Sequence, residues 1–282
     1  MPRIAYVNGR YLPHANASVH IEDRGYQFAD GVYEVMAVAQ GRLVDEGPHM
    51  ERFRRSLAEL RIAEPMSAAG LGIVMREVIR RNRLRDGILY LQTTRGVAPR
   101  DHLFPAEAVP SVVMTVRRAK PPSIDAIEKG VGIVIQPDIR WGRCDIKSVS
   151  LLPNVLAKQA AREAGAYESW FVDKDGFITE GSSTNAWIVT QAGEVVTRQR
   201  DNSILPGVTR AVLLDLARRD GIKVTERPFT PTEAKAAGEA FLTSTTSIVL
   251  PVTAIDGQKL GNGKPGPVAQ RLRRLYLDTI ST

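Results

Sequence analysis

The chain has 282 residues, a net charge of +7, 43% hydrophobic residues and 24% charged residues, a composition that fits a globular protein with a sizeable core. Basic residues are scattered along the whole length and aromatic residues make up only 6%, which disfavours a nucleic-acid-binding protein. No segment reaches the ~18 uninterrupted apolar residues of a membrane-spanning helix. The single cysteine, Cys144, agrees with a reducing compartment, so a cytoplasmic location is expected. The four histidines form no ligand cluster, so no metal site is expected.

The first half of the chain predicts a sheet accompanied by helices. Asn8-Gly9 is a hairpin signal between two short strands, and apolar residues recur at helical spacing in two later segments. The predicted elements are a strand at Ile4–Val7, a hairpin over 35–44, helices over 49–60 and 71–84, and strands over 88–94 and 111–116.

A Pro-Pro pair, Pro121-Pro122, marks the clearest boundary because proline supplies no backbone donor and disfavours helix. We expect an N-terminal domain over 1–117, a linker over 118–123 and a C-terminal domain over 124–282.

The second half alternates strands with helices. Thr230-Pro231-Thr232-Glu233 is a capping box with proline at the first helical position, which predicts a helix from there. The other predicted elements are strands over 131–135, 170–172, 185–189 and 240–242, and helices over 154–163 and 211–216. Strands and helices in two unequal layers favour an α+β fold with mixed sheets.

Lys147 differs from the other eight lysines, most of which fall in turns or on helix surfaces. It lies in the segment 144–152, where alternation predicts a strand with Asp145, Lys147 and Val149 on one face. A single strand lysine is usually a surface residue that extends its amine into water. A desolvated amine, however, loses its proton more easily and can form an imine with an aldehyde.

Two segments could bind a phosphate group. Thr243-Ser244-Thr245-Thr246-Ser247 offers five successive hydroxyls, and Leu205-Pro206-Gly207-Val208-Thr209 precedes a helix whose first backbone amides are available to an anion. Each could equally be a solvated turn. Because the chain has neither a Gly-x-Gly-x-x-Gly motif nor a Walker-type loop, two such sites favour a phosphorylated cofactor.

The segment Pro99-Arg100-Asp101-His102 places a guanidinium two residues from an imidazole. This is either a solvated loop or a donor pair for a carboxylate.

Together these motifs resemble the D-amino-acid aminotransferases, a family of fold-type IV enzymes that use pyridoxal 5'-phosphate (PLP). The resemblance runs in order over nearly the whole chain. It rests on EDRGYQFADGVYEV at 22–35, DIRW at 138–141, RCDIKS at 143–148, TEGSS at 179–183 and TSTTS at 243–247.

The resemblance implies a smaller N-terminal α/β sandwich domain, a larger C-terminal domain with a barrel-like mixed sheet, and a residue-by-residue assignment of the site. Lys147 is implied as the Schiff-base lysine and Glu180 as the partner of the pyridine nitrogen. The implied cofactor contacts are Arg52, Val208, Thr209, Ser244 and Thr245 at the phosphate, and Leu205 against the ring. The implied substrate-carboxylate residues are Tyr33, Arg100 and His102. One departure is Pro206, where the family pattern has lysine.

The expected activity is transfer of the amino group of D-amino acids, of the D-alanine or D-glutamate type, to 2-oxoglutarate or pyruvate with ping-pong kinetics. The resemblance also implies a homodimer in which the Arg100/His102 loop crosses the interface. Two alternatives on the same fold stay open, a branched-chain L-amino-acid aminotransferase and an aminodeoxychorismate lyase. The Pro99–His102 loop favours the D-type enzyme.

Overall fold

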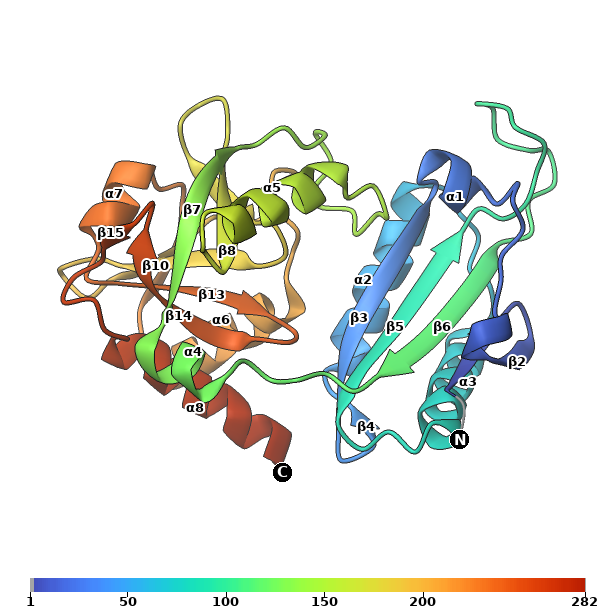
Figure 1. The fold of residues 1–282 in the computed structure, drawn as a ribbon, viewed down its shortest axis with the longest axis horizontal. Coiled ribbons are helices and arrows are strands. Elements are labelled where there is room, and N and C mark those ends of the chain that lie inside the picture. Colours follow the sequence, from blue (N-terminus) through green and yellow to red (C-terminus); the bar gives the residue numbers. More distant parts are fainter. Residues whose placement is uncertain (1–2, 282) are drawn as a thin grey trace. The chain divides into compact units, whose positions relative to one another are not determined.

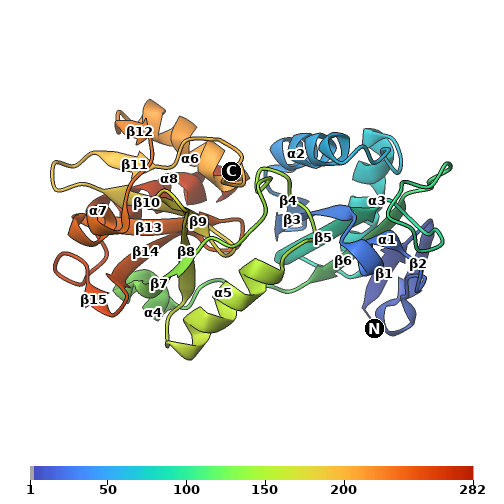
Figure 2. The same ribbon diagram turned by 90° about the horizontal axis from the view of Figure 1, so that it is seen from above.

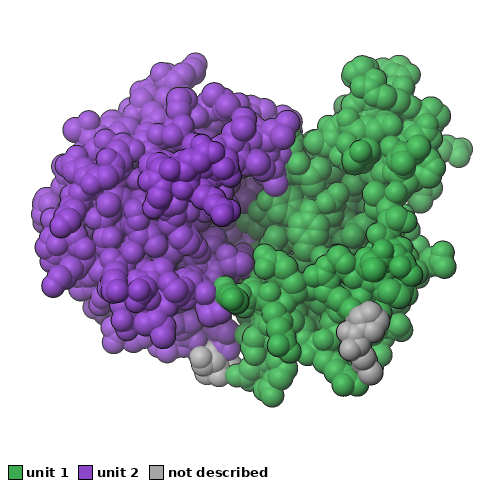
Figure 3. Space-filling view, in the orientation of Figure 1, with its two compact units in different colours: residues 1–120, 146–150 green, residues 121–145, 151–282 purple. Residues whose placement is uncertain are grey.

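The computed structural model describes residues 3–281, and the chain divides into two compact units (Figure 3). The first comprises residues 1–120 and 146–150, and the second comprises residues 121–145 and 151–282. Residues 146–150 belong to the first unit although they follow the predicted linker over 118–123. The reason is that Ile146, 4% exposed, joins the hydrophobic core of the first unit.

The first unit is built on a six-stranded antiparallel sheet that two helices cover on one face (Figures 1 and 2). The strand order is β2 (Arg10–Pro13), β1 (Ile4–Val7), β6 (Ser111–Arg117), β5 (Gly87–Thr94), β3 (Gly31–Ala39) and β4 (Arg42–Leu43). The covering helices are α2 (Glu46–Glu59) and α3 (Ala68–Arg81), and shorter helical segments are α1 (Arg24–Phe28) and His14–Asn16.

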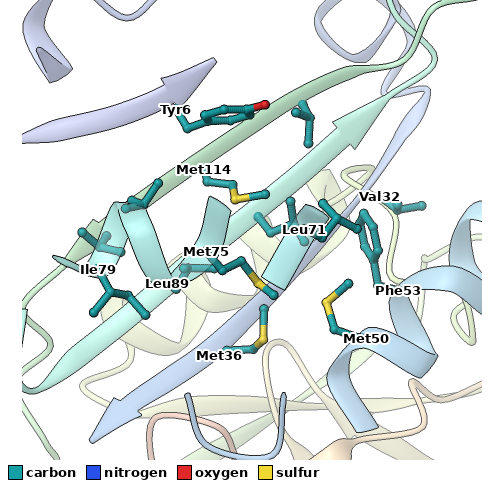
Figure 4. Close-up of a cluster of buried hydrophobic side chains, with 14 of the residues drawn as sticks. Tyr6, Val32, Met36, Met50, Phe53, Leu71, Met75, Ile79, Leu89 and Met114 are labelled. Carbon is teal, nitrogen blue, oxygen red and sulfur yellow. The ribbon is translucent and has the colours of Figure 1, made fainter. Parts of the chain in front are cut away.

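The core of this unit lies between the sheet and its two helices (Figure 4). Met36 from β3 and Leu89 from β5 pack there with Phe53 from α2 and Met75 from α3, all fully buried. From Val32 onward, strand β3 alternates between buried and partly exposed residues, as expected for a sheet with one covered face. That alternation also carries Glu34 to the buried side.

The second unit contains a nine-stranded mixed sheet (Figure 1). The strand order is β12 (Val224–Glu226), β11 (Val195–Thr197), β10 (Asn185–Val189), β13 (Glu239–Ser244), β14 (Ile248–Ile255), β7 (Val131–Pro137), β8 (Glu168–Val172) and β9 (Ile178–Gly181), with β15 (Gln258–Lys259) paired to β14. The helices are α4 (Ile124–Lys129), α5 (Leu152–Glu163), α6 (Val208–Arg219), α7 (Pro231–Ala236) and α8 (Pro267–Ser281).

This sheet curls back on itself. Strand β9 ends the strand order, yet it lies beside β10 near the other end, where Gly181 N donates to Thr184 O at 2.7 Å. Parallel pairing occurs between β11 and β12, β14 and β7, and β7 and β8, and the other pairs are antiparallel. The α+β class and the barrel-like mixed sheet are therefore confirmed.

The strand predicted over 144–152 is wrong. Asp145 and Ile146 are both buried, at 3% and 4% exposure, whereas alternation places them on opposite faces. The reason is that the chain passes from one unit to the other at this point. Asp145 is held in the second unit by Arg143 at 2.9 Å, and in the first unit only a single bridge, from Ser148 to Val32, pairs this segment with β3.

Within residues 3–281, no helix combines the length and apolar character needed to cross a bilayer.

Candidate active site

Lys147 is fixed to the first unit by its backbone. Its carbonyl accepts a hydrogen bond from Tyr33 N at 3.0 Å, its amide donates to Ser56 Oγ at 3.3 Å, and Val149 N donates to Gly31 O at 3.0 Å. Lys147 Nζ lies 4.3 Å from the centre of the Tyr33 ring. The structure therefore brings together the predicted cofactor lysine and one predicted substrate residue.

Tyr33 also stacks on Tyr90 of the neighbouring strand, with ring centres 5.7 Å apart. Burial, with a smaller contribution from Tyr33, raises the pKa of Tyr90 to about 12. The Tyr90 hydroxyl is thus protonated at neutral pH, and it donates to Gln92 Oε1 at 2.6 Å. The stack fixes the ring of Tyr33 against which Lys147 lies.

Arg52, the predicted phosphate residue, lies on α2 and binds the carboxylate of Glu34. Its Nε and Nη2 donate to the two Glu34 oxygens at 2.8 and 2.7 Å, and His49 Nδ1 lies 2.7 Å from Glu34 Oε2. Burial alone raises the pKa of Glu34, which is fully buried, but Arg52 and His49 outweigh it and lower that pKa to about 2. Arg52 is therefore oriented by a permanent buried anion.

Sequence reasoning missed the roles of Glu34 and His49, although a signal was present. Glu34 falls in register with Val32 and Met36, so β3 carries its carboxylate into the core. A buried carboxylate requires a cation, and His49 and Arg52 are one helical turn apart on α2.

Arg100 and His102 lie in the exposed loop between β5 and β6, and both contact Phe28. The Arg100 guanidinium lies 5.1 Å from the centre of the Phe28 ring, and the His102 ring centre lies 5.5 Å from it. Within the described part of the first unit, neither side chain hydrogen-bonds to Tyr33.

Glu180, on β9 of the second unit, has a carboxylate oriented by three donors. Arg140 Nη1 pairs with one oxygen, Asn185 Nδ2 donates to the other at 3.0 Å, and Leu205 N lies 3.0 and 3.1 Å from the two oxygens. Asn185 Nδ2 also reaches Leu205 O at 3.1 Å. Glu180 is only 5% exposed, so the structure presents an oriented carboxylate in a largely buried setting.

Arg140 is a further residue whose role the sequence did not reveal. It donates to Asp138 at 2.7 and 2.9 Å and to Ser203 O at 3.0 Å, and its guanidinium lies 4.5 Å from the Phe171 ring centre. Burial alone lowers the pKa of Arg140, but the nearby carboxylates of Glu180 and Asp138 outweigh burial and raise that pKa overall, so the guanidinium stays charged. That fixed cation keeps Glu180 in place.

The other predicted phosphate contacts lie in the second unit, near the strands that carry Glu180 and Asn185. Val208 and Thr209 open α6, and the amides of a first helical turn have no intrahelical partners. The N-cap, Gly207, provides no side-chain cap for them. A Cβ on Gly207 would lie 2.0 Å from Asn185 Oδ1, so only glycine allows this close approach.

Ser244 ends β13, which pairs with β10 through Thr243 and Asn185. Ser244 Oγ accepts from Ser247 N at 3.1 Å, which closes the turn that contains Thr245. Helix-start amides and hydroxyls suit a phosphate, and a carboxylate suits a protonated ring nitrogen. The residues of the second unit therefore fit PLP.

This fold and this donor set fit an enzyme that uses PLP. A family model described as "Amino-transferase class IV" matches residues 31–255, and the chain belongs to that family.

Two relatives are similar over nearly their whole length. The chain is 41% identical over 273 residues to the D-alanine aminotransferase of Bacillus licheniformis, with 97% of this chain and 95% of that protein covered. It is 38% identical over 268 residues to the D-alanine aminotransferase of Staphylococcus haemolyticus, with 95% and 94% covered.

Two solved structures share the fold. The branched-chain amino acid aminotransferase of Escherichia coli matches with a TM-score of 0.92 at 24% identity, over 99% of this chain and 95% of that one. The branched-chain amino acid aminotransferase of Thermobaculum terrenum, solved in its PLP form, matches with a TM-score of 0.86 at 22% identity, over 99% and 94%. Identities of 24% and 22% speak for the fold alone.

Proposed function

We propose that the protein is a PLP-dependent transaminase that moves the amino group of D-amino acids, such as D-alanine and D-glutamate, to a 2-oxo acid such as 2-oxoglutarate or pyruvate. The observation that supports PLP as the cofactor is the oriented Glu180 carboxylate, which lies in the same unit as the helix-start amides that could bind a phosphate. The preference for D-amino acids is supported by the two D-alanine aminotransferases that match over nearly their whole length. The likeness to branched-chain enzymes is weaker in sequence.

The cofactor contacts are proposed residue by residue. Lys147 would hold PLP covalently through Nζ, and Glu180 would keep a proton on the ring nitrogen. The phosphate would be bound by the amides of Val208 and Thr209, the hydroxyls of Ser244 and Thr245, and Arg52, while Leu205 would pack against the ring. When bound, PLP supplies an electron sink for charge that develops at the substrate's α-carbon.

The protein's own residues would then move one proton and anchor the substrate. Lys147 Nζ, once the substrate amine has replaced it, would remove the proton from the α-carbon as a general base. Tyr33, Arg100 and His102 would bind the α-carboxylate, for which a guanidinium offers paired donors. Alternation of an amino donor and an amino acceptor on one site gives ping-pong kinetics.

A homodimer with the Arg100/His102 loop contributed across the interface is part of this proposal. The loop is supported as an interface element by apolar residues that the described chain leaves exposed in and near it, namely Tyr26, Leu103 and Val109. A cytoplasmic location also stays a prediction, supported by Cys144 as the single cysteine.

The decisive experiment is Lys147→Ala. We expect this variant to lose transamination of D-alanine with 2-oxoglutarate, and borohydride reduction followed by mass spectrometry should find no cofactor on the protein. Lys174→Ala, in an exposed turn, is the matched control and should behave as the wild type. Cofactor still attached to Lys147→Ala would overturn the assignment of the lysine. Rates with L-leucine or aminodeoxychorismate above that with D-alanine would favour the alternative activities.

A further inference from the structure

The loop between β5 and β6 is attached to the segment before β3 at its base. Asp23 and Val97 form a bridge, Arg24 N donates to Gly96 O at 2.9 Å, and Ala98 N donates to Glu22 O at 3.3 Å. These are backbone contacts near residues 96–98. The tip, with Arg100, His102 and Phe104, depends on side chains.

Asp30 binds two buried arginines at once. Its Oδ2 accepts from Arg24 Nε at 2.9 Å and from Arg95 Nε at 2.7 Å, and its Oδ1 accepts from Arg95 Nη2 at 3.0 Å. Arg24 and Arg95 are only 3% and 4% exposed. The positive charges of Arg24 and Arg95 are therefore both paired with the Asp30 carboxylate.

Arg24 links Asp30 to the part of the loop that holds Arg100 and His102. These two residues, which are predicted to bind the substrate carboxylate, are called the carboxylate trap below. Its Nη1 donates to Asp101 O at 2.6 Å, on the residue between Arg100 and His102. Its guanidinium also lies 4.8 Å from the centre of the Phe28 ring, the ring that both Arg100 and His102 contact. Arg24 therefore supports both the backbone and the platform of the trap.

Arg95 holds the far side of the tip. Its guanidinium lies 3.6 Å from the centre of the Phe104 ring, and the Arg61 guanidinium lies 4.8 Å from the same centre. Arg95 is itself fixed by donation to Leu60 O at 2.7 Å and Arg61 O at 2.9 Å. The tip is thus held at two points, by two arginines that share Asp30.

We infer that Asp30 is a positioning residue for substrate binding: through Arg24 and Arg95 it fixes the loop tip that presents Arg100 and His102 to the substrate carboxylate. This inference rests on the proposed function of that pair. Burial raises the pKa of Asp30, but hydrogen bonds from Arg95 and Arg24 outweigh it and lower the pKa overall. The carboxylate is therefore charged at neutral pH and keeps both arginines in place.

The test compares Asp30→Asn with wild-type holoenzyme. Asparagine keeps the size of the side chain and removes its charge. We expect the KM for D-alanine to rise roughly tenfold or more, as for loss of a charge-assisted contact, with a smaller change in kcat. For an amine without a carboxylate, KM should stay near the wild-type value. Asp125→Asn, in an exposed ion pair with Lys129, is the matched control.

Hydrogen–deuterium exchange separates this role from general stability. In Asp30→Asn, peptides that cover 100–104 should exchange faster, while those of β5 should be unchanged. If Asp30→Asn does not fold, Phe104→Leu replaces it, because Phe104 is 47% exposed and its removal frees the tip from Arg95. That variant should show the same rise in KM and the same faster exchange.

Unchanged KM for D-alanine and unchanged exchange in the folded variant would overturn the inference. Arg100→Ala distinguishes its failure from failure of the proposed trap. If Arg100→Ala raises KM and Asp30→Asn does not, the trap stands and Asp30 is not its positioning residue. If Arg100→Ala leaves the KM unchanged, both ideas are overturned, whatever the exchange data show.

Discussion

A carboxylate that is buried away from water must be neutralised by its neighbours, and Glu34 is the clearest case in this protein. Two residues from α2 supply the partners, Arg52 with a two-pronged contact and His49 with a single one. Removal of one member of a buried charge pair leaves the other without compensation. Glu34 therefore contributes both to stability and to the orientation of Arg52.

Glu34→Gln is expected to lower the free energy of unfolding at pH 7 by about 3 kcal/mol, as when a buried ion pair is broken. The folded-state pKa of Glu34, about 2, lies below its ordinary value of 4.5. Its stabilising contribution is thus complete above pH 4.5 and is lost as the pH falls towards 2. Urea unfolding of both proteins over this range should show the difference between them shrinking.

Glu77→Gln is the control. The hydrogen bonds from Arg80 and Arg81 lower the pKa of Glu77 to about 2 as well, but both arginines are exposed on the surface of α3, where solvent screens such pairs. This variant should unfold nearly as the wild type does at every pH. Equal losses in the two variants would mean that burial of Glu34 is not the cause.

At the scale of elements, local turn chemistry and periodicity predicted much of the fold. Strands β1 and β10 have the predicted bounds. The first hairpin turns at Asn8 and Gly9 with φ of 44° and 88°, as Asn-Gly favours. These signals are contained within a few neighbouring residues, so a sequence displays them directly.

Elements that depend on distant partners were missed. Helix α1 has five residues, and its N-cap, Asp23, also accepts from Thr94 Oγ1 at 3.0 Å, a contact that no local pattern reveals. Helix α8 is a different case, because its buried residues Ala269, Leu272 and Tyr276 recur at helical spacing and could have predicted it. The strand expected around Lys147 is wrong because the chain passes from one unit to the other within that segment.

Only one of the two hydrogen bonds of a capping box forms at the start of α7. Thr230 Oγ1 accepts from Glu233 N at 3.1 Å, whereas the Glu233 carboxylate binds Arg227 at 2.5 and 3.1 Å. Thr230→Ala should reduce the free energy of unfolding by about 1 kcal/mol, measured in urea. Thr232→Ala, on the exposed side of the same turn, should have little effect, and equal losses in both would count against the cap.

At the scale of the whole molecule, sequence motifs predicted which residues form the site, but not which residues those site residues contact. Lys147, Arg52 and Glu180 were each assigned by resemblance, and their roles stay a proposal. Their neighbours Glu34 and Arg140 were not assigned, because each binds a partner distant in sequence: Glu34 binds Arg52, 18 residues away, and Arg140 binds Glu180, 40 residues away. The alternation of β3 does indicate that Glu34 is buried, but which cation it binds is set by how the helix packs on the sheet, and one sequence does not reveal that packing.

The last prediction tests whether one subunit completes the site of another. Arg100→Ala subunits keep Lys147 but lose the trap, and Lys147→Ala subunits keep the trap but lose the lysine. At D-alanine concentrations well below the KM of Arg100→Ala, each homodimer should be nearly inactive. In a mixed dimer with two-fold symmetry, the Arg100→Ala subunit would receive an intact loop from its partner, so one of the two sites would be restored.

Co-expression of the two variants with different affinity tags, followed by two-step purification, isolates the mixed dimers. Their activity per dimer should be about half that of the wild type, because one site in two is complete. If Arg100 and His102 serve the site of their own chain, every site in the mixed dimer lacks either the lysine or the loop, and no activity should return. Failure of the two tags to co-purify would instead contradict the dimer itself. Wild-type subunits carrying the same two tags control for tag effects and for the yield of pairing.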